Sequence, residues 1–492
     1  MDDPLDFFRS RIDHMIDLNH PLAVLAQRMP WQTLEASIAH HFARQAKDPK
    51  MVRQVDMFGT VHQPVGGGVS NAGRPRLPLR LMIGLLYLKH AFNESDEGLV
   101  ARWAETPTWQ YFCGSEYFEH RVPCDPSQIS RFRKAIGEEG VEEMLAQTIN
   151  AACQMKLIDP DALQEIIVDS TVQSKAIAYP TDSKLMEVAR RKLVHLARLM
   201  GVNLKQTYER ESKKLMRRAG GYAHARQFKR MRRVLRRQRT VLGRLKRDLQ
   251  RKLEQLDLKP HQRQIAAEIL GKAQRIYEQC AGKTASKDKL YAWHAEEVSC
   301  ISKGKARQRY EFGVKVGIAT TLHGNLVVGA RAFHGNPFDG HTLASQMEQA
   351  AILMQDNRVQ PKAVYTDLGY RGVDAQVPHV SVCHRGKKKR LTAWQLRSLP
   401  RRQAIEPIIG HLKADHRMDR CHLKGALGDK LHAVLCAAGY NIRWLLRAIA
   451  RKGMSLIFLR NLLARVAHKA GIRTAVRVLQ RYLRIKPALD AR

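Results

Sequence analysis

The stretch EIIVDSTV at residues 165–172 decides the fold class, because here the chain first changes from a helical pattern to a strand pattern. Isoleucine, valine and threonine dominate it, and such β-branched side chains favour a pleated strand. One acidic residue, Asp169, lies inside this apolar run. The segment therefore predicts a buried strand that carries a carboxylate.

Further strand patterns follow only after a long gap. The turn LHGN separates two of them, which is typical of a β-hairpin. A helix is expected at about 341–355, and the strand after it ends on Asp367. The four further predicted strands are RYEFGVKVGIATT (309–321), LVVGARAF (326–333), KAVYTD (362–367) and HVSVCH (379–384).

The order of these elements predicts the architecture. A first strand, an antiparallel hairpin, a helix and a fourth strand follow one another as they do in a ribonuclease-H-like sheet. Such a sheet places the first and fourth strands side by side, so Asp169 and Asp367 are expected to meet at one edge. We predict an α/β fold with a mixed five-stranded, ribonuclease-H-like sheet, interrupted by a long helical insertion and preceded by a helical domain.

A later helix brings a third carboxylate. RRQAIEPIIGHLKADHRM at 401–418 is basic and helical in pattern, with a single glutamate, Glu406, in its first part. Residues three, four or seven apart share a helix face, which places Arg402 and Lys413 in line with Glu406. Pro407 favours a first helical turn, so a preceding turn is the alternative place for Arg402. An ordinary structural helix with a solvated charged face is the alternative for the whole segment.

Together the three acidic residues suggest a metal site. Asp169, Asp367 and Glu406 would supply hard oxygen ligands, which suit two Mg²⁺ or Mn²⁺ ions. Two such ions about 4 Å apart activate an attacking hydroxyl and stabilise the leaving oxygen in phosphodiester cleavage. Arg402 and Lys413 would then hold phosphates near the ions. Taken singly, each aspartate could equally be a strand-end or turn residue.

The charge of the chain indicates a polyanionic partner. Its 492 residues contain 84 lysines and arginines against 46 acidic residues, a net charge of +38. Nucleic acid is the usual partner of such a surface. The longest apolar runs are too short to span a bilayer, so no membrane contact is expected. The acidic first residues, MDDPLDFF, do not resemble a signal peptide, and we expect a cytoplasmic, nucleoid-associated bacterial protein.

Half of the net charge lies in the insertion. Residues 184–254 hold 24 lysines and arginines against 5 acidic residues, which leaves +19. Apolar residues at helical spacing predict a long helical hairpin or coiled-coil arm, with turns at 220–222 or 259–260. The one-signed charge favours phosphate contact over a merely solvated face. The arginines expected to contact DNA are Arg232, Arg233, Arg236 and Arg237.

The predicted domains follow from these patterns. Residues 1–160 form a helical, DNA-binding domain, in which Ser95 and Asp125 or Ser127 are expected helix caps. The helix after Asp125 could be the recognition helix of a helix-turn-helix unit, or part of a plain helical bundle. The remaining predicted units are a catalytic domain (161–445), the basic helical insertion within it (184–300) and a basic helical tail (446–492).

Other polar residues give weaker signals. Asp339 in NPFDGHT fits a helix cap better than a metal ligand. Trp394 could stack on an unpaired base or pack in the core. The eight cysteines form no Cys-x-x-Cys pair, which argues against a zinc ribbon or a disulfide framework. Five histidines likewise lack zinc spacing: His334, His341, His384, His411 and His416.

Three of these stretches resemble one known family. IIVDSTV, VYTDLGYRG and RRQAIEPIIGHLKADHRM are similar to the two aspartate strands and the glutamate helix of DDE transposases of bacterial insertion sequences, in particular the insertion-sequence-five family. The wider group has a tyrosine, two residues, an arginine, three residues, the glutamate, six residues and a lysine. Arg402, Glu406 and Lys413 fall on that spacing. Leu399 stands at the tyrosine place. The resemblance extends from about residue 70 to about 445.

The resemblance implies a transposase that binds terminal inverted repeats, cuts donor DNA and joins the 3′-ends to a target. Its catalytic and metal-binding residues would be Asp169, Asp367 and Glu406, with two Mg²⁺ or Mn²⁺ ions. A homodimer on DNA is expected, because two ends must be held together. Further expected DNA contacts are Arg371, Lys387 and Lys388. The alternatives are a non-catalytic DNA-organising protein and a ribonuclease-H-like nuclease without transposition.

Overall fold

The computed structural model describes most of the chain. It covers residues 10–42, 54–55, 61–62, 76–285, 288–302 and 309–469; for 54–55, 61–62 and 454–469 only the backbone is described. The acidic start of the chain and residues 470–492 of the predicted basic tail lie outside the described residues. No helix of the described part is long and apolar enough to cross a membrane.

The central element is a curled mixed sheet. Its strands are β3 (Glu165–Ser174), β4 (Ser299–Ser302), β5 (Tyr310–Thr321), β6 (Val327–Phe333), β7 (Ala363–Tyr365) and β8 (Ser381–Cys383). β5 pairs antiparallel with β3 on one side and with β6 and β4 on the other, while β7 and β8 continue the sheet in parallel with β3. The mixed α/β class is confirmed, and so is the pairing of the first predicted strand with the fourth. β4 was not predicted.

The open edge of β6 is covered by side-chain amides. Asn441 donates to the carbonyl of Val327 (2.8 Å) and accepts from its N–H (3.0 Å). Gln349 makes the same pair of bonds with Ala330 (3.3 and 3.0 Å). Unpaired strand edges are templates for aggregation, and these amides satisfy two residues of this one. The helices that carry them are therefore fixed to the sheet.

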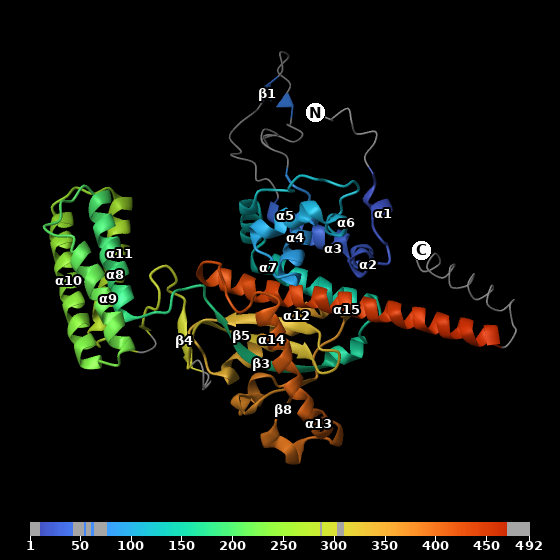
Figure 1. Cartoon of the computed structure of the whole chain (residues 1–492). Helices are drawn as coiled ribbons and strands as arrows, with labels where there is room; N and C mark the ends of the chain where they lie inside the picture. The colour runs from blue at the N-terminus through green and yellow to red at the C-terminus, as the bar shows by residue number, and fades with distance from the viewer. Residues whose placement is uncertain are drawn as a thin grey trace.

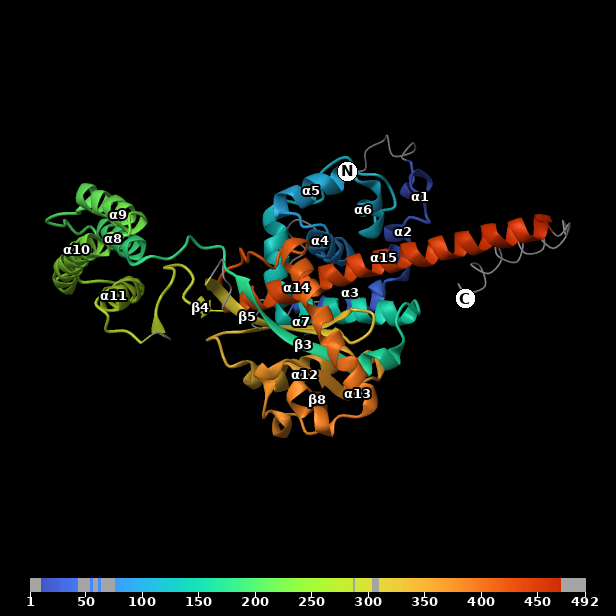
Figure 2. The same ribbon diagram turned by 60° about the horizontal axis from the view of Figure 1, so that its bottom comes forward.

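Most of the helices outside the insertion share one hydrophobic core with the sheet. The helices are α1 (Ile12–Met15), α2 (Pro21–Arg28), α3 (Trp31–Ala39), α4 (Leu79–Ala91), α5 (Asp96–Glu105), α6 (Pro107–Phe112), α7 (Pro126–Gln154), α12 (Leu343–Leu353), α13 (Ala393–Ser398), α14 (Ile405–Ala414) and α15 (Gly425–Lys469); β1 (Gln54–Val55) and β2 (Val61–His62) form a separate short ladder. In Figures 1 and 2, α15 runs between the N-terminal helices and the sheet. A single cluster of buried apolar side chains extends from Leu22 to Leu445.

Two of the expected caps begin helices here. The Ser95 side chain accepts from the N–H of Gly98 (2.9 Å) at the start of α5, and Asp125 accepts from Ser127 (2.8 Å) at the start of α7. Within α7, Arg133 is buried and bonds Asp96 (2.9 Å). That arginine stabilises the packing of α7 on α5 and is not available to DNA. The helix-turn-helix alternative stays a prediction.

The insertion folds into a bundle of four helices, not the expected hairpin or coiled-coil arm. They are α8 (Asp182–Leu199), α9 (Glu209–His224), α10 (Phe228–Glu254) and α11 (Pro260–Cys280). The bundle has its own apolar core and stands apart from the sheet (Figures 1 and 2). Gly220 and Gly221 lie inside α9, whereas the chain reverses just after it, where Arg226 has a φ of 55°. Lys259 and Pro260 do mark a turn, since they begin α11.

Candidate active site

The two aspartates lie at the same level of neighbouring strands: Asp169 is inside β3, and Asp367 comes two residues after the end of β7. β3 and β7 are parallel, and Ile167 lies beside Tyr365. Asp169 and Asp367 each follow two residues later, so both carboxylates come from the same end of this strand pair. The Asp169 carboxylate accepts the N–H of Ser170 at 2.7 Å. The Asp367 carboxylate accepts the N–H of Gly369 at 2.8 Å and caps the short 3₁₀ helix η7 (Leu368–Tyr370).

Glu406 lies in the first turn of α14. Its side chain is 63% exposed, while Ile405, Ile408 and Leu412 are buried on the other side of the helix. α14 packs on β3, the strand that carries Asp169. The apolar face of this helix thus fixes it on the sheet and leaves the glutamate at the surface beside the aspartate strand.

Arg402 connects the strand and the helix. It lies in the 3₁₀ helix η10 (Leu399–Ala404), the separate turn before α14 that the proline position suggested. Its Nη1 lies 3.8 Å from Oδ2 of Asp169, and its Nη2 lies 3.8 Å from Oε1 of Glu406. One guanidinium therefore stands between two of the three predicted carboxylates and offsets their mutual repulsion.

The three carboxylates share a neighbourhood but do not close around one point. Among the described residues, two groups of metal-ligand type have all their ligand atoms within 4.8 Å of one another, and neither contains Asp169, Asp367 or Glu406. Three carboxylates are nevertheless the donors that Mg²⁺ and Mn²⁺ prefer. The side chains are also partly open to solvent, as an ion that retains water ligands requires. The donor set fits such ions.

A fourth carboxylate, that of Asp339, adjoins the site. Asp339 is not a helix cap as predicted: η5 (Asp339–Thr342) begins after Phe338, and no side chain caps it. Instead Asp339 pairs with the buried Lys315 at 3.0 Å. The sequence offered little signal for this, because the strand residue and the loop residue come together only in the folded chain.

Gly369 shows how near Asp339 is to Asp367. A Cβ placed on this glycine would lie 3.0 Å from Oδ1 of Asp367 and 3.5 Å from Oδ2 of Asp339, so the two carboxylates border the same small space. The phenol of Tyr370 is buried behind them. Burial raises the pKa of Tyr370, and three carboxylates raise it further: Asp339, Asp169 and Asp367. Tyr370 therefore stays protonated.

The predicted basic residues near the site occupy different surroundings. Arg371 and Lys388 are exposed, Lys387 binds the Asp374 carboxylate, and Lys413 is half-buried in α14. Trp394 does not pack in the core: it is 54% exposed, and its indole N–H donates to the Glu165 carboxylate (3.1 Å).

Of the bundle helices, α10 carries the most basic residues, and several of them lie on its surface. Arg232, Arg233 and Arg236 are exposed, while Arg237 donates to the Glu211 carboxylate at 2.7 Å. The apolar residues of α10 face the bundle core at helical spacing. The charge is therefore a feature of the outer face and leaves the packing of the bundle undisturbed.

Comparison with known proteins gives two family matches and one relative. Residues 10–135 match the family described as a transposase domain (DUF772), and residues 284–442 match the transposase DDE domain. The second match includes Asp367 and Glu406 but begins after Asp169. A protein of Rhizobium meliloti, "Uncharacterized protein ORF8 in nfe locus", is 41% identical over 223 residues, 45% of this chain and 95% of that protein. No solved structure matches. By its two transposase domains, the chain belongs to the DDE transposases of insertion sequences.

Proposed function

We propose that this transposase binds the terminal inverted repeats of its element and cuts and joins DNA strands at a site built from Asp169, Asp367 and Glu406. The observation that carries the proposal is Arg402, which lies 3.8 Å from both Asp169 and Glu406. Asp367 comes two residues after the end of the neighbouring parallel strand β7. Three acidic residues from distant segments of a very basic chain thus converge on one end of the sheet.

The strand order supports a ribonuclease-H-like fold for the catalytic part. β6, β5, β3, β7 and β8 lie in that order across the sheet, with β5 antiparallel to β3 and with β7 and β8 parallel to it. The sequence predicted two of these pairings, that of β5 with β6 and that of β3 with β7. β4 extends the outer side of β5 where the chain returns from the bundle.

Asp169, Asp367 and Glu406 would hold two Mg²⁺ or Mn²⁺ ions. Bound there, the ions would supply an activated oxygen nucleophile and stabilisation of the leaving oxygen. The chain's own contribution is positional. Arg402 keeps the glutamate helix beside the first aspartate, and Lys413, two turns after Glu406 in α14, would orient a phosphate of the bound strand.

The remaining basic surface would hold the DNA outside the site. The exposed arginines of α10 lie on a bundle that projects from the sheet, where they can follow a phosphate backbone. Arg371, Lys387 and Lys388 surround the β8 end of the sheet. We place this activity in the bacterial cytoplasm, on nucleoid DNA, and in a homodimer that holds two transposon ends.

The deciding experiment uses DNA that carries the inverted repeats flanking the reading frame. Asp169→Asn and Glu406→Gln should each abolish strand cleavage with Mg²⁺, because each replaces a charged oxygen ligand with a neutral group of similar shape. DNA affinity should remain near that of the unaltered chain, because carboxylates repel phosphate. Normal cleavage by either variant would refute the assignment. Cleavage without joining to a target would favour a nuclease instead.

A further inference from the structure

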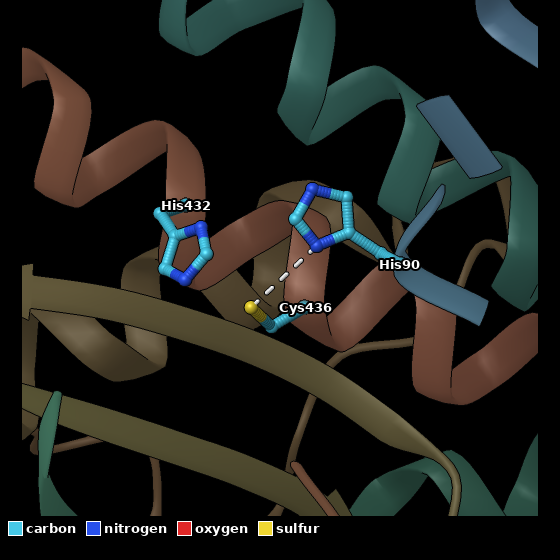
Figure 3. Close-up of side chains that lie close together, drawn as sticks. All are labelled: His90, His432 and Cys436. Carbon is cyan, nitrogen blue, oxygen red and sulfur yellow. Dashed lines mark hydrogen bonds between the residues drawn. The ribbon is translucent and has the colours of Figure 1, made fainter. Parts of the chain in front are cut away.

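A second group of metal-ligand type lies far from the carboxylates, inside the helical core. It consists of His90 at the end of α4 and of His432 and Cys436, one turn apart in α15. All three side chains are buried, with exposed fractions of 1%, 4% and 0%, and their ligand atoms all lie within 4.8 Å of one another. Figure 3 shows the three side chains converging between the two helices.

The hydrogen bonds of the histidines leave nitrogen atoms available to the centre. Nε2 of His432 bonds the carbonyl oxygen of Arg417 at 2.8 Å, so it carries the proton, and Nδ1 retains its lone pair. Histidines that bind metals usually donate their other ring N–H in this way. Nδ1 of His90 lies 3.7 Å from Sγ of Cys436 (Figure 3). One nitrogen of each imidazole and the cysteine sulfur lie within 4.8 Å of one another.

The backbone is built for this approach. A Cβ at Gly439 would lie 2.5 Å from the carbonyl carbon and from Cβ of His90, closer than real Cβ atoms come. Only glycine therefore lets α15 pass so near the end of α4. Gly439 lies three residues after Cys436, and the close approach brings His90 within reach of the thiol.

We propose that His90, His432 and Cys436 bind one Zn²⁺ ion that cross-links α4 to α15. Zn²⁺ prefers imidazole and thiolate ligands, whereas Mg²⁺ and Mn²⁺ prefer oxygen ligands. The three residues leave one position of a tetrahedral site for a further ligand. Because α4 belongs to the N-terminal helices and α15 covers the sheet, the ion would tie these two parts together. This site is separate from the proposed catalytic one.

Three cations lie near the cluster: Lys89, Arg133 and Arg417. Lys89 and Arg133 are both paired with Asp96, and the Arg417 guanidinium donates to the carbonyl of Asn93 at 3.0 Å. On binding, the Cys436 thiol loses its proton to solvent and its sulfur forms the bond to the metal, so each ion bound releases one proton.

The competing explanation is a thiol–imidazole hydrogen bond in an ordinary packed core. Cobalt separates the two, because Co²⁺ bound to a thiolate shows a charge-transfer band in the near ultraviolet. The full chain, freed of metals with a chelator, is titrated with Co²⁺. The expected result is one equivalent bound with that band, and its displacement by one equivalent of Zn²⁺. A folded chain without the band would overturn the proposal, whatever the variants do.

Variants then assign the ligands. Cys436→Ser should remove the band and weaken Zn²⁺ binding by more than the roughly 10- to 100-fold that loss of an outer partner costs. Cys153→Ser, at a half-buried cysteine outside the cluster, should retain both. Zn²⁺ should raise the thermal midpoint of the unaltered chain and not that of Cys436→Ser. A band that persists in Cys436→Ser would refute the site. The Glu406→Gln variant should retain the band, because Glu406 belongs to the proposed catalytic site and not to this one.

Discussion

The guanidinium of Arg402 lies 3.8 Å from the carboxylate of Asp169, although the two residues come from distant segments of the chain. Its other terminal nitrogen lies equally far from Glu406. Sequence spacing alone suggested that Arg402 would hold a phosphate. In the folded chain it also balances two carboxylates that would otherwise repel each other where the first aspartate strand meets the glutamate helix.

Arg402→Gln should therefore reduce strand cleavage by about 100-fold, the scale of losing one preorganised electrostatic partner. DNA affinity should change little, because the side chain is mostly covered. The measurement is single-turnover cleavage at saturating Mg²⁺, with Arg397→Gln, an exposed arginine of α13, as the matched control. Equal rates for the two variants would contradict the role given to Arg402.

Asp339→Asn should lower cleavage by roughly 10- to 100-fold, the effect of removing one charged hydrogen-bond partner. The substitution leaves the Lys315 ammonium without its carboxylate beside Asp367. Lys315→Met in the same chain should restore part of the rate, since the uncompensated charge is then gone. Asp374→Asn, an exposed carboxylate paired with Lys387, is the control. Additive losses in the double variant would argue against this coupling.

Lys175→Met should destabilise the chain by about 3–5 kcal/mol, as removal of one member of a buried ion pair does. Lys175 lies 2.8 Å from both Glu297 and Asp429. Lys175 and Glu297 belong to the two chain segments that connect the bundle to the sheet, and Asp429 belongs to α15, so the lysine links all three segments. Urea unfolding measures the loss. Lys184→Met, at an exposed lysine of α8, should change stability by less than about 0.5 kcal/mol.

The ion pairs of Lys175 with Asp429 and Glu297 should make stability depend on pH in two windows. Burial raises the pKa of Asp429, but hydrogen bonds from His334 and Lys175 lower it more, so the net pKa is below 3.8. Its contribution is present above pH 3.8 and is lost as the pH falls through the lowered pKa. Burial lowers the pKa of Lys175, but bonds to Asp429 and Glu297 raise it above 10.5. That contribution is present below pH 10.5 and is lost as the pH rises through the raised pKa. The urea midpoints of the unaltered chain and of Lys175→Met, measured across the pH range, test both windows.

The sequence was informative where local pattern and topology agree. Alternating and β-branched runs predicted β3, β5, β6, β7 and β8, and the strand order was enough to bring Asp169 and Asp367 together. β4 was missed because Ser299–Ser302 is short and polar, and it becomes a strand only by pairing with β5.

Features that depend on tertiary packing were not predicted from the sequence. Periodicity identified helices in the insertion but could not say how they pack. The turn expected at Gly220 is wrong because a helix can include glycine at a cost of only about 1 kcal/mol relative to alanine, and α9 does so. Asp339 and His90 have partners far away in sequence. The only sequence signal for the buried cluster was His432 and Cys436 four residues apart, which is too common a spacing to argue from alone.

Replacing Arg232, Arg233 and Arg236 with glutamine should weaken DNA binding and reduce its salt dependence, by about 0.9 in the logarithmic slope for each phosphate that is no longer neutralised. Binding to duplex DNA is measured at several salt concentrations. The matched control removes three cations of α11 that pair with acidic residues: Arg263, Lys272 and Arg275. An unchanged slope in the α10 variant would rule out phosphate binding by this face.

Cleavage should occur in trans within a dimer on DNA. Each chain offers one acidic trio, and two transposon ends must be joined to one target, so two chains are needed. The bundle projects from the sheet and has its own core, so it can reach DNA held by the partner, and its removal leaves the main core intact.

The test mixes two chains that are each inactive alone: Glu406→Gln, and a chain with residues 182–280 replaced by a short linker. In a mixed dimer, the bundle of the first chain would hold the DNA that the intact site of the second one cuts. Recovered cleavage supports action in trans, and a dimeric mass on DNA should accompany it. A monomeric mass with no recovery would mean that the bundle serves the active site of its own chain.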